Sequence, residues 1–395
     1  MLSSKEITGV ASGREFNTYG WLCQRAWVEI DLAALSHNVR QLVSLLSSQT
    51  QLMAVVKADA YGHGAISVAK TALESGASWL GVATVPEGIE LREAGIKAPI
   101  LILGAIQTPE QIQAIAQWKL QPTLCSPKQA LVFSNTLEAI QHSSPLPVHI
   151  KLDTGMSRLG TNWQQTGEFV RLVKSLPHLT IASIYSHLAT ADDPDTTIMK
   201  EQHRRFEEAI AQIKAMGIEP PCLHLANSAA TLADSSLHYN IVRVGLAVYG
   251  LYPSDHLQNT INLQPVLQVK ARITQVKTIS AGTGVSYGHQ FIAPQELRIA
   301  VVGIGYADGV PRHLSNNMQV LIRGQRIPQI GTITMDQMMV DVSTIPDIQE
   351  GEVVTLLGKQ GKEQISANDW AEKLETISWE ILCGFKHRLP RVAMN

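Results

Sequence analysis

The chain has 395 residues, of which 45% are hydrophobic and 17% charged, and a formal net charge of −2. This length predicts two domains with sizeable cores. The near-neutral charge argues against nucleic acid or an anionic membrane as a partner, and no apolar run is long enough for a membrane helix. The four cysteines are scattered and the N-terminus lacks an apolar signal stretch. We therefore expect a cytoplasmic protein without a metal centre.

The first residues of the chain lack the regular pattern of the later ones. Residues 1–24 are polar and aperiodic, so we expect a loose N-terminal extension. Residues 27–30 alternate like a short strand. Asp31 then precedes a segment with apolar residues on one helical face, which predicts a helix capped by Asp31. The residues on this face are Leu35, Val39, Leu42 and Leu46.

A regular rhythm of short apolar runs begins at Leu52. The candidate strands are residues 52–56, 79–83, 100–103, 122–124, 148–152, 181–186, 223–225 and 241–244. Helix-like segments, such as 109–118 and 201–216, separate most of them. Apolar strands alternating with helices predict a parallel sheet, and eight such units predict a closed (β/α)8 TIM-like barrel, which we place over residues 25–265. An open doubly wound sheet is the alternative, although its usual G-x-G-x-x-G fingerprint is missing.

The rhythm changes after Gln264-Pro265. Further strand-like runs come next, with Gly-containing turns and little helix between them, at residues 266–279, 297–302, 319–322, 338–342 and 353–356. This pattern predicts a C-terminal all-β domain over residues 266–395.

Barrel enzymes carry their active sites at the carboxyl ends of the strands. The polar residues expected there are Lys57, Asp153, Arg158, His187, Asn227, Ser228, Arg243 and Gly245. The loops after the last two strands commonly bind phosphate, and there Ser228, Gly245 and the Leu246 backbone could supply donors. A desolvated lysine at a strand end offers a free amine to a carbonyl cofactor, although an isolated lysine is more often a surface charge.

The context of Lys57 is specific, because the sequence here resembles the alanine racemase family. Residues 56–64 (VKADAYGHG) are similar to that family's signature for the lysine that binds pyridoxal 5'-phosphate (PLP). Further matching motifs are KLDTGMSRLG at 151–160, SHLATAD at 186–192, ANS at 226–228, VRVG at 242–245, VSYG at 285–288, GYADG at 305–309 and Met335-Asp336. The motifs lie in order from roughly Trp27 to Arg391, which is nearly the whole chain.

The resemblance implies an N-terminal PLP barrel and a C-terminal β domain in a head-to-tail homodimer with shared active sites. It implies a two-base interconversion of L-alanine and D-alanine, which supplies D-alanine for peptidoglycan. Lys57 would be the Schiff-base lysine and Tyr287 the second catalytic base. The implied cofactor-binding residues are Lys57, Tyr61, Arg158, His187, Asn227, Ser228, Arg243, Gly245 and Leu246. Arg158 and the Met335 N–H would contact the substrate carboxylate, and Lys151 matches a lysine that is carbamylated in some members.

The chemistry of two residues agrees with this assignment. PLP stabilises a carbanion by drawing electrons into its ring. A guanidinium only donates, so Arg243 would leave the pyridine nitrogen unprotonated and the ring a weaker electron sink. A weaker sink suits racemisation and limits transamination. His187, which could equally be a structural histidine, would orient Tyr287 or Arg243 rather than transfer protons.

Three residues depart from the family's pattern. Trp379 stands where the family often places a tyrosine that contacts the phosphate, and an indole N–H donates but does not accept. Thr332 and Thr334 stand where some members carry Arg and Cys. These departures leave the phosphate and entrance contacts open, and with them a broader specificity among amino acids.

Three rival functions make different demands on the sequence. A PLP decarboxylase of the same architecture, acting on a basic amino acid, would need an acidic pocket and a cysteine-bearing loop, and neither pattern is found. A non-catalytic PLP carrier would not need Tyr287. A cofactor-free Schiff-base aldolase would not need Arg243 or the phosphate-binding set.

Overall fold

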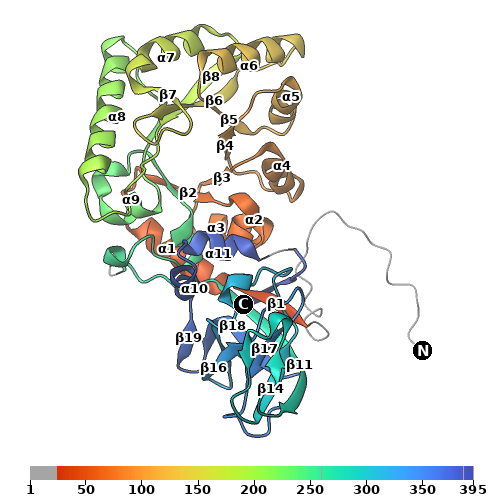
Figure 1. The fold of residues 1–395 in the computed structure, drawn as a ribbon. Coiled ribbons are helices and arrows are strands. Elements are labelled where there is room, and N and C mark those ends of the chain that lie inside the picture. Colours follow the sequence, from red (N-terminus) through yellow and green to blue (C-terminus); the bar gives the residue numbers. More distant parts are fainter. Residues whose placement is uncertain (1–24, 259, 386, 395) are drawn as a thin grey trace. The chain divides into compact units, whose positions relative to one another are not determined.

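The computed structural model describes all residues except 1–24, 259, 386 and 395, so the expected N-terminal extension lies outside the described residues. The chain divides into two compact units (Figure 1). The barrel unit is Leu32–Val266, and the sheet unit contains the described residues up to Asp31 and from Leu267 onward. Among the described residues, no helix combines the length and apolar character needed to cross a membrane.

The barrel unit contains a strand at each position where the sequence predicts one. The strands are β2 (Gln51–Val55), β3 (Trp79–Val82), β4 (Ile100–Ala105), β5 (Gln121–Leu124), β6 (Leu146–Asp153), β8 (Leu179–Tyr185), β9 (Leu223–His224) and β10 (Ile241–Val244). Their order in the sheet is β10-β2-β3-β4-β5-β6-β8-β9, with β7 (Thr161–Asn162) beside β6. The order follows the chain without reversal, which excludes the doubly wound alternative.

The two ends of this parallel sheet are joined by backbone hydrogen bonds between β9 and β10. The Asn240 N–H donates to the Leu223 carbonyl at 3.0 Å, and the Arg243 N–H donates to the Ala226 carbonyl at 3.0 Å. The barrel predicted from the sequence is therefore confirmed, with its seam between the last two strands.

Helices surround the strands on the outside, as Figure 1 shows for α4 to α8. The helices are α1 (Leu32–Ser44), α2 (Lys57–Gly62), α3 (Ala65–Glu74), α4 (Val85–Glu93), α5 (Pro109–Gln117), α6 (Pro127–Ala139), α7 (Thr166–Ser175), α8 (Thr197–Ala215) and α9 (Ser228–Ala233). Short 3-10 turns are η2 (Trp163–Gln165), η3 (Ser235–Leu237), η4 (Leu246–Tyr249) and η5 (Asp255–Leu257).

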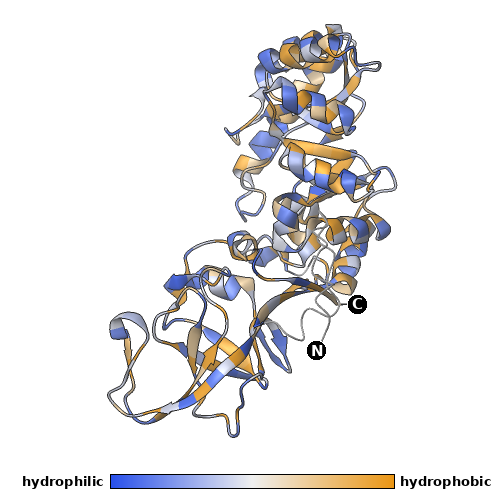
Figure 2. Cartoon of the chain, turned by 90° about the vertical axis from the view of Figure 1, so that its right-hand side faces the viewer, coloured by the Kyte–Doolittle hydropathy of each residue, from blue (hydrophilic) through white to orange (hydrophobic). Residues whose placement is uncertain are grey.

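The local sequence explains where several of these helices begin. Thr84, Thr108 and Ser126 cap α4, α5 and α6, and each cap is followed by a proline in the first turn. A hydroxyl cap satisfies a backbone N–H that the helix leaves unpaired, and proline has no N–H to lose there. In α1, Leu35, Val39 and Leu42 are buried as expected, but the helix ends before Leu46. The helices of the barrel unit contain both hydrophobic and hydrophilic residues (Figure 2).

The sheet unit is built on one sheet with strand order β19-β18-β15-β16-β17-β14-β11-β1-β20. Its strands are β1 (Ala26–Asp31), β11 (Leu267–Ile279), β14 (Leu297–Val302), β15 (Gln319–Ile322), β16 (Gln325–Ile330), β17 (Met338–Asp341), β18 (Val353–Gln360), β19 (Glu363–Ile365) and β20 (Arg391–Met394). A separate hairpin joins β12 (Gly284–Val285) to β13 (Phe291–Ile292). The remaining elements are η6 (Tyr287–His289), η7 (Arg312–Leu314), α10 (Ala367–Lys373) and α11 (Ser378–Gly384). The sheet was expected, whereas the two short helices were not.

The first strand differs from its predicted location. We expected residues from 25 onward to begin the barrel, but β1 lies in the sheet unit. There it pairs antiparallel with β11, from Ala26↔Ala271 to Ile30↔Leu267, and parallel with β20. The alternation at residues 27–30 correctly indicated a strand. It could not indicate the partner strand, because that partner lies more than two hundred residues away.

Candidate active site

The polar residues predicted at the strand ends lie where the barrel strands finish. Lys57 follows β2, Arg158 follows β6 and His187 follows β8. Asn227 and Ser228 follow β9, and Gly245 follows β10. Arg243 lies within β10 itself. Because carboxyl ends of barrel strands share one face, this placement gathers these side chains at one mouth of the barrel.

The turn after Lys57 is left-handed. Residues 58–61 have φ between 52 and 54°, although none of them is glycine. Such a conformation costs roughly 1–2 kcal/mol per residue, because Cβ approaches the following carbonyl oxygen. Hydrogen bonds hold the turn: the Ala58 N–H donates to Glu87 Oε1 at 2.7 Å, and the Ala65 N–H donates to Asp59 Oδ1 at 2.8 Å. Strain that its surroundings enforce in this way is typical of functional sites.

Arg243 is the most deeply buried cation of the site, with 4% of its surface exposed. Its Nη2 donates to the carbonyls of Ser186 at 2.7 Å and Leu225 at 3.0 Å. Its two Nη atoms also donate to ring nitrogens, of His224 at 3.0 Å and His187 at 3.2 Å. No hydrogen bond between described residues uses Nε. The Nε–H of this fixed guanidinium can therefore meet an acceptor that is not part of the described residues.

The contact with Arg243 also determines which ring nitrogen of His187 carries the proton. Arg243 only donates, so the Nδ1 of His187 must accept, and its proton is on Nε2. Burial lowers the pKa of His187 far below its ordinary value, and the charges of Arg243, Lys151, Arg158 and Lys57 lower it further. His187 is therefore a neutral imidazole that can donate from Nε2 but does not act as an acid. These shifts also show that the four cations share one region of the barrel.

Ser228, Gly245 and Tyr61 form the wall expected to hold phosphate. The Ser228 hydroxyl accepts from the N–H groups of Gly245 at 3.1 Å and Ala247 at 3.4 Å, and it keeps its own proton to donate. A Cβ on Gly245 would lie 2.6 Å from the Tyr61 hydroxyl oxygen. Leu246 begins η4, and the first N–H groups of a helix have no partner within it. Together they place hydroxyl and N–H donors around one small space.

Asn227, one of the predicted cofactor-binding residues, has a structural role. Its Oδ1 accepts from the Ala230 N–H at 3.0 Å, so the side chain caps α9. It thereby fixes Ser228, the first residue of that helix. Tyr61 is fixed in turn by the Tyr249 ring, whose centroid lies 4.9 Å away. The Tyr249 hydroxyl donates to the Val55 carbonyl at 2.8 Å, next to the strand end that carries Lys57.

Lys151 is buried on β6, with 6% of its surface exposed. Burial, with the nearby charges of Arg243, Arg158 and Lys57, lowers its pKa to about 8. Among the described residues, no carboxylate pairs with Lys151, Arg158 or Arg243. The barrel mouth is thus strongly positive and suits a ligand with several negative charges.

Tyr287 and Met335 belong to the sheet unit. Tyr287 begins η6 and is 73% exposed. The buried Thr332 holds its backbone in two ways: the Thr332 hydroxyl donates to the Tyr287 carbonyl at 2.8 Å, and the Ser286 hydroxyl donates to the Thr332 carbonyl at 2.7 Å. Thr332, one of the departures from the family's pattern, therefore positions the loop that carries the predicted base.

Met335 lies on a second, tightly held loop. The N–H groups of Tyr306 and Ala307 donate to the carbonyls of Thr334 and Met335, both at 3.0 Å. The Thr334 hydroxyl donates to the Gln337 carbonyl at 2.8 Å. The Met335 N–H takes part in no hydrogen bond between described residues, so it can meet a ligand.

An ion pair that sequence reasoning missed supports this loop. Arg25 donates to both carboxylate oxygens of the fully buried Asp308, at 2.8 and 2.7 Å. Asp308 also accepts from the Gly305 N–H at 3.0 Å, and Arg388 pairs with Asp336 at 2.7 Å. The motif GYADG contained Asp308, but the partner at Arg25 could not be seen from the sequence because it was assigned to the barrel.

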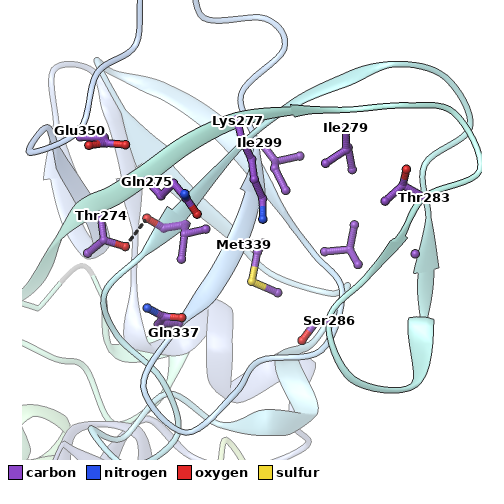
Figure 3. Close-up of a pocket in the computed structure, with 13 residues that line it drawn as sticks. Thr274, Gln275, Lys277, Ile279, Thr283, Ser286, Ile299, Gln337, Met339 and Glu350 are labelled. Carbon is purple, nitrogen blue, oxygen red and sulfur yellow. Dashed lines mark hydrogen bonds between the residues drawn. The ribbon is translucent and has the colours of Figure 1, made fainter.

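A cavity of about 620 Å³ is lined by residues of the sheet unit (Figure 3). Apolar side chains such as Ile299, Val301 and Met339 form part of its lining, with Lys277 and Glu350 as charged members. Its lining includes Ser286, the residue before Tyr287. None of the predicted cofactor-binding residues lines this cavity, so it is not the candidate site.

Comparison with known families gives two matches that cover most of the chain. The family model described as "Alanine racemase, N-terminal domain" matches residues 30–253. The one described as "Alanine racemase, C-terminal domain" matches residues 266–393.

Individual relatives agree over nearly their full lengths. A protein named alanine racemase from Nostoc sp. strain PCC 7120 is 78% identical, over 98% of this chain and 100% of that protein. One of the same name from Halothermothrix orenii is 43% identical, over 93% of this chain and 97% of that protein. The solved structure of alanine racemase from Bacillus anthracis with bound L-Ala-P has a TM-score of 0.88 and 37% identity, covering 94% of this chain and 95% of that one.

The wall at Gly245 leads to a first prediction. Gly245→Ala should weaken PLP binding at least about tenfold, roughly 1.4 kcal/mol, because the new Cβ would lie 2.6 Å from the Tyr61 hydroxyl. The measurement is a fluorescence titration of cofactor-free protein with PLP. Tyr61→Phe in the same background removes the clashing oxygen, so the double variant should bind no worse than Tyr61→Phe alone. Unchanged affinity in Gly245→Ala would show that PLP does not touch this wall.

Proposed function

This chain belongs to the alanine racemase family, and we propose that it interconverts L-alanine and D-alanine with PLP held at the barrel mouth. The product D-alanine would serve peptidoglycan synthesis in the cytoplasm. The observation that carries the proposal is the set of cations around Lys57, with Arg243 fixed in the barrel and its Nε–H without a partner among the described residues.

The residues at the barrel mouth fit this cofactor. The hydroxyls of Tyr61 and Ser228 and the Leu246 N–H would hold its phosphate, and Gly245 would leave room for it because it has no Cβ. Lys57 would hold its aldehyde carbon through the amine. Arg243 Nε would donate to the pyridine nitrogen, which matches the N–H that has no partner among the described residues. When bound, PLP withdraws electron density from the substrate's α-carbon and makes its proton removable.

Two bases are needed to invert the α-carbon. A proton must leave from one face and another must arrive at the opposite face. We assign Lys57 Nζ to the D-alanine proton and the Tyr287 hydroxyl to the L-alanine proton. The neutral His187 can donate a hydrogen bond from Nε2 to a phenolic oxygen, which would stabilise Tyr287 after it loses its proton.

The substrate carboxylate would be bound by Arg158 and the Met335 N–H. Arg158 is exposed on the loop after β6. Asp153, the last residue of β6, holds this loop, because its Oδ1 accepts from the N–H groups of Gly155 and Ser157, both at 3.0 Å. These two bonds fix the loop one residue before Arg158. A cation and a backbone N–H together recognise a carboxylate through charge-assisted hydrogen bonds.

We further propose a homodimer in which each site takes Tyr287 and Met335 from the partner. In the single chain, Tyr287 is 73% exposed and Met335 is 52% exposed. A base that must act on one face of a bound substrate works better when water is excluded. The exposed Ile292 on the hairpin next to Tyr287 adds an apolar contact that a second copy would cover.

Subunit mixing tests the two bases and the shared site together. Lys57→Ala should lose covalent PLP, and Tyr287→Phe should keep PLP but lose proton exchange from L-alanine far more than from D-alanine. Each variant alone should be inactive as a racemase. Mixed and allowed to exchange subunits, they should recover activity, because half of the sites in a heterodimer contain both bases. Exchange without recovered activity would contradict the shared site.

The two threonines should separate catalysis from substrate binding. Thr332→Val removes the bond to the Tyr287 carbonyl, so it should slow solvent-deuterium exchange into L-alanine by roughly three- to tenfold while exchange into D-alanine changes less. Thr334→Val, the matched control, loosens the Met335 loop and should raise KM for both isomers equally. Equal effects of the two variants on both isomers would contradict these assignments.

Lys151 should carry a carbamate when the protein is in bicarbonate buffer. The neutral amine attacks the carbon of CO2, forms an N–C bond and releases one proton. Because the pKa of Lys151 is lowered to about 8, the neutral amine and hence the carbamate should increase as the pH rises through that value. Carbon-13 NMR with labelled bicarbonate should show a carbamate signal that Lys151→Met lacks. The same signal in both proteins, or none in either, would contradict it.

A further inference from the structure

A chain of hydrogen bonds leads from Arg243 away from the site and across the barrel interior. Arg243 Nη1 contacts His224 Nδ1 at 3.0 Å, and His224 Nε2 contacts the Ser183 hydroxyl at 2.7 Å. The Ser183 hydroxyl contacts His149 Nδ1 at 2.5 Å, and His149 Nε2 contacts Gln121 Oε1 at 2.8 Å. Its members come from β10, β9, β8, β6 and β5.

The groups at the two ends fix the direction of every bond in this chain. A guanidinium only donates, so His224 Nδ1 must accept and its proton must be on Nε2, from which it is donated to Ser183. At the other end, Gln121 Oε1 only accepts, so the neutral His149 must carry its proton on Nε2, and its Nδ1 must accept the Ser183 proton. His224, Ser183 and His149 thus each give one proton and receive one.

Burial requires this order of donors and acceptors, because it keeps both imidazole rings neutral. His224, Ser183 and His149 are fully buried, and burial lowers the pKa of His149 to about 3 and that of His224 well below its ordinary value. Both imidazoles are therefore neutral. Barrel interiors are usually filled by branched apolar side chains, and a buried polar network is stable only when each of its groups is satisfied. This one is satisfied throughout.

The surroundings of His224 leave it no other arrangement. Its ring stacks on Tyr185 with a centroid distance of 4.5 Å and an interplanar angle of 6°. The same Tyr185 ring lies below Arg243, whose guanidinium carbon is 5.1 Å from the ring centroid. The Tyr185 hydroxyl bonds to Thr123 at 2.7 Å, outside the chain of bonds. Stacking therefore fixes the plane of His224, Arg243 requires Nδ1 to accept, and Ser183 accepts the proton that Nε2 must carry.

We propose that Ser183 and His149 are positioning residues that hold His224 as an acceptor for Arg243 and thereby aim the guanidinium at the cofactor. Without the Ser183 acceptor, the Nε2–H of His224 has no partner in the barrel interior, and the ring is no longer held where Nδ1 accepts from Arg243. The guanidinium then loses a fixed acceptor and can shift. The catalytic consequence rests on the proposed function, whereas the protonation pattern does not.

Two matched variants test the proposal in the full-length protein. Ser183→Ala removes the hydroxyl that links the two histidines. Thr123→Val removes a hydroxyl that is equally buried and also makes two hydrogen bonds, to Tyr185 and to the Ile102 carbonyl, but it leaves the chain intact. Ser183→Thr keeps the hydroxyl and serves as the conservative variant.

Nitrogen-15 NMR of histidine-labelled protein gives a readout independent of activity. In the wild type, His224 and His149 should both be neutral with the proton on Nε2. Ser183→Ala should shift the ring-nitrogen resonances of His224, because its Nε2–H loses its acceptor, while Thr123→Val and Ser183→Thr should match the wild type. A charged or Nδ1-protonated His224 in the wild type would overturn the proposal, even if the Ala variant failed to fold.

Kinetics then tests the positioning role. Ser183→Ala should lower kcat for racemisation by about tenfold or more, with little change in KM, while Thr123→Val stays within about threefold. Equal losses in both variants would indicate general destabilisation and overturn the role. A wild type with the expected protonation but no racemase activity would refute the proposed function and leave the hydrogen-bond order standing.

Discussion

The site is organised around a cation that cannot lose its charge. Burial lowers the pKa of Arg243 only to about 10, so it stays protonated at neutral pH although only 4% of its surface is exposed. A buried charge must be solvated by its neighbours, and no carboxylate of the described residues pairs with it. Two carbonyls and two imidazole nitrogens do so instead. Both imidazoles must therefore be neutral acceptors, and the positive charge remains uncompensated.

That uncompensated charge explains the behaviour of the residues around it. It helps to keep His187 neutral and contributes, after burial, to the lowered pKa of Lys151. A carboxylate beside Arg243 would cancel this field and weaken the attraction for a phosphate or a substrate carboxylate. The arrangement costs folding stability, since like charges lie near one another. Anionic ligands would recover part of that cost when they bind.

The sequence predicted those features that depend on residues close together in the chain. Each barrel strand was predicted because its apolar run is continuous, and Lys57 and Ser228 were placed correctly because they directly follow such runs. The left-handed turn at residues 58–61 was not predictable, because only Asp59 in it tolerates that conformation well and distant Glu87 helps to hold it. The partner of β1, the pair Arg25–Asp308 and the chain through His149 likewise depend on contacts across scores of residues. No pattern in the sequence indicated that the Tyr287 side chain would be exposed.

The two units hold their functional residues by different means. In the barrel, side chains are fixed by buried bonds to other side chains, as with Arg243 and His224. In the sheet unit, Thr332 and Thr334 bond to backbone carbonyls of the loops that carry Tyr287 and Met335. Neutral hydroxyls therefore hold both loops without adding charge. With the roles proposed for these residues, changes on the two loops would alter how substrate is bound while the field of Arg243 stays the same.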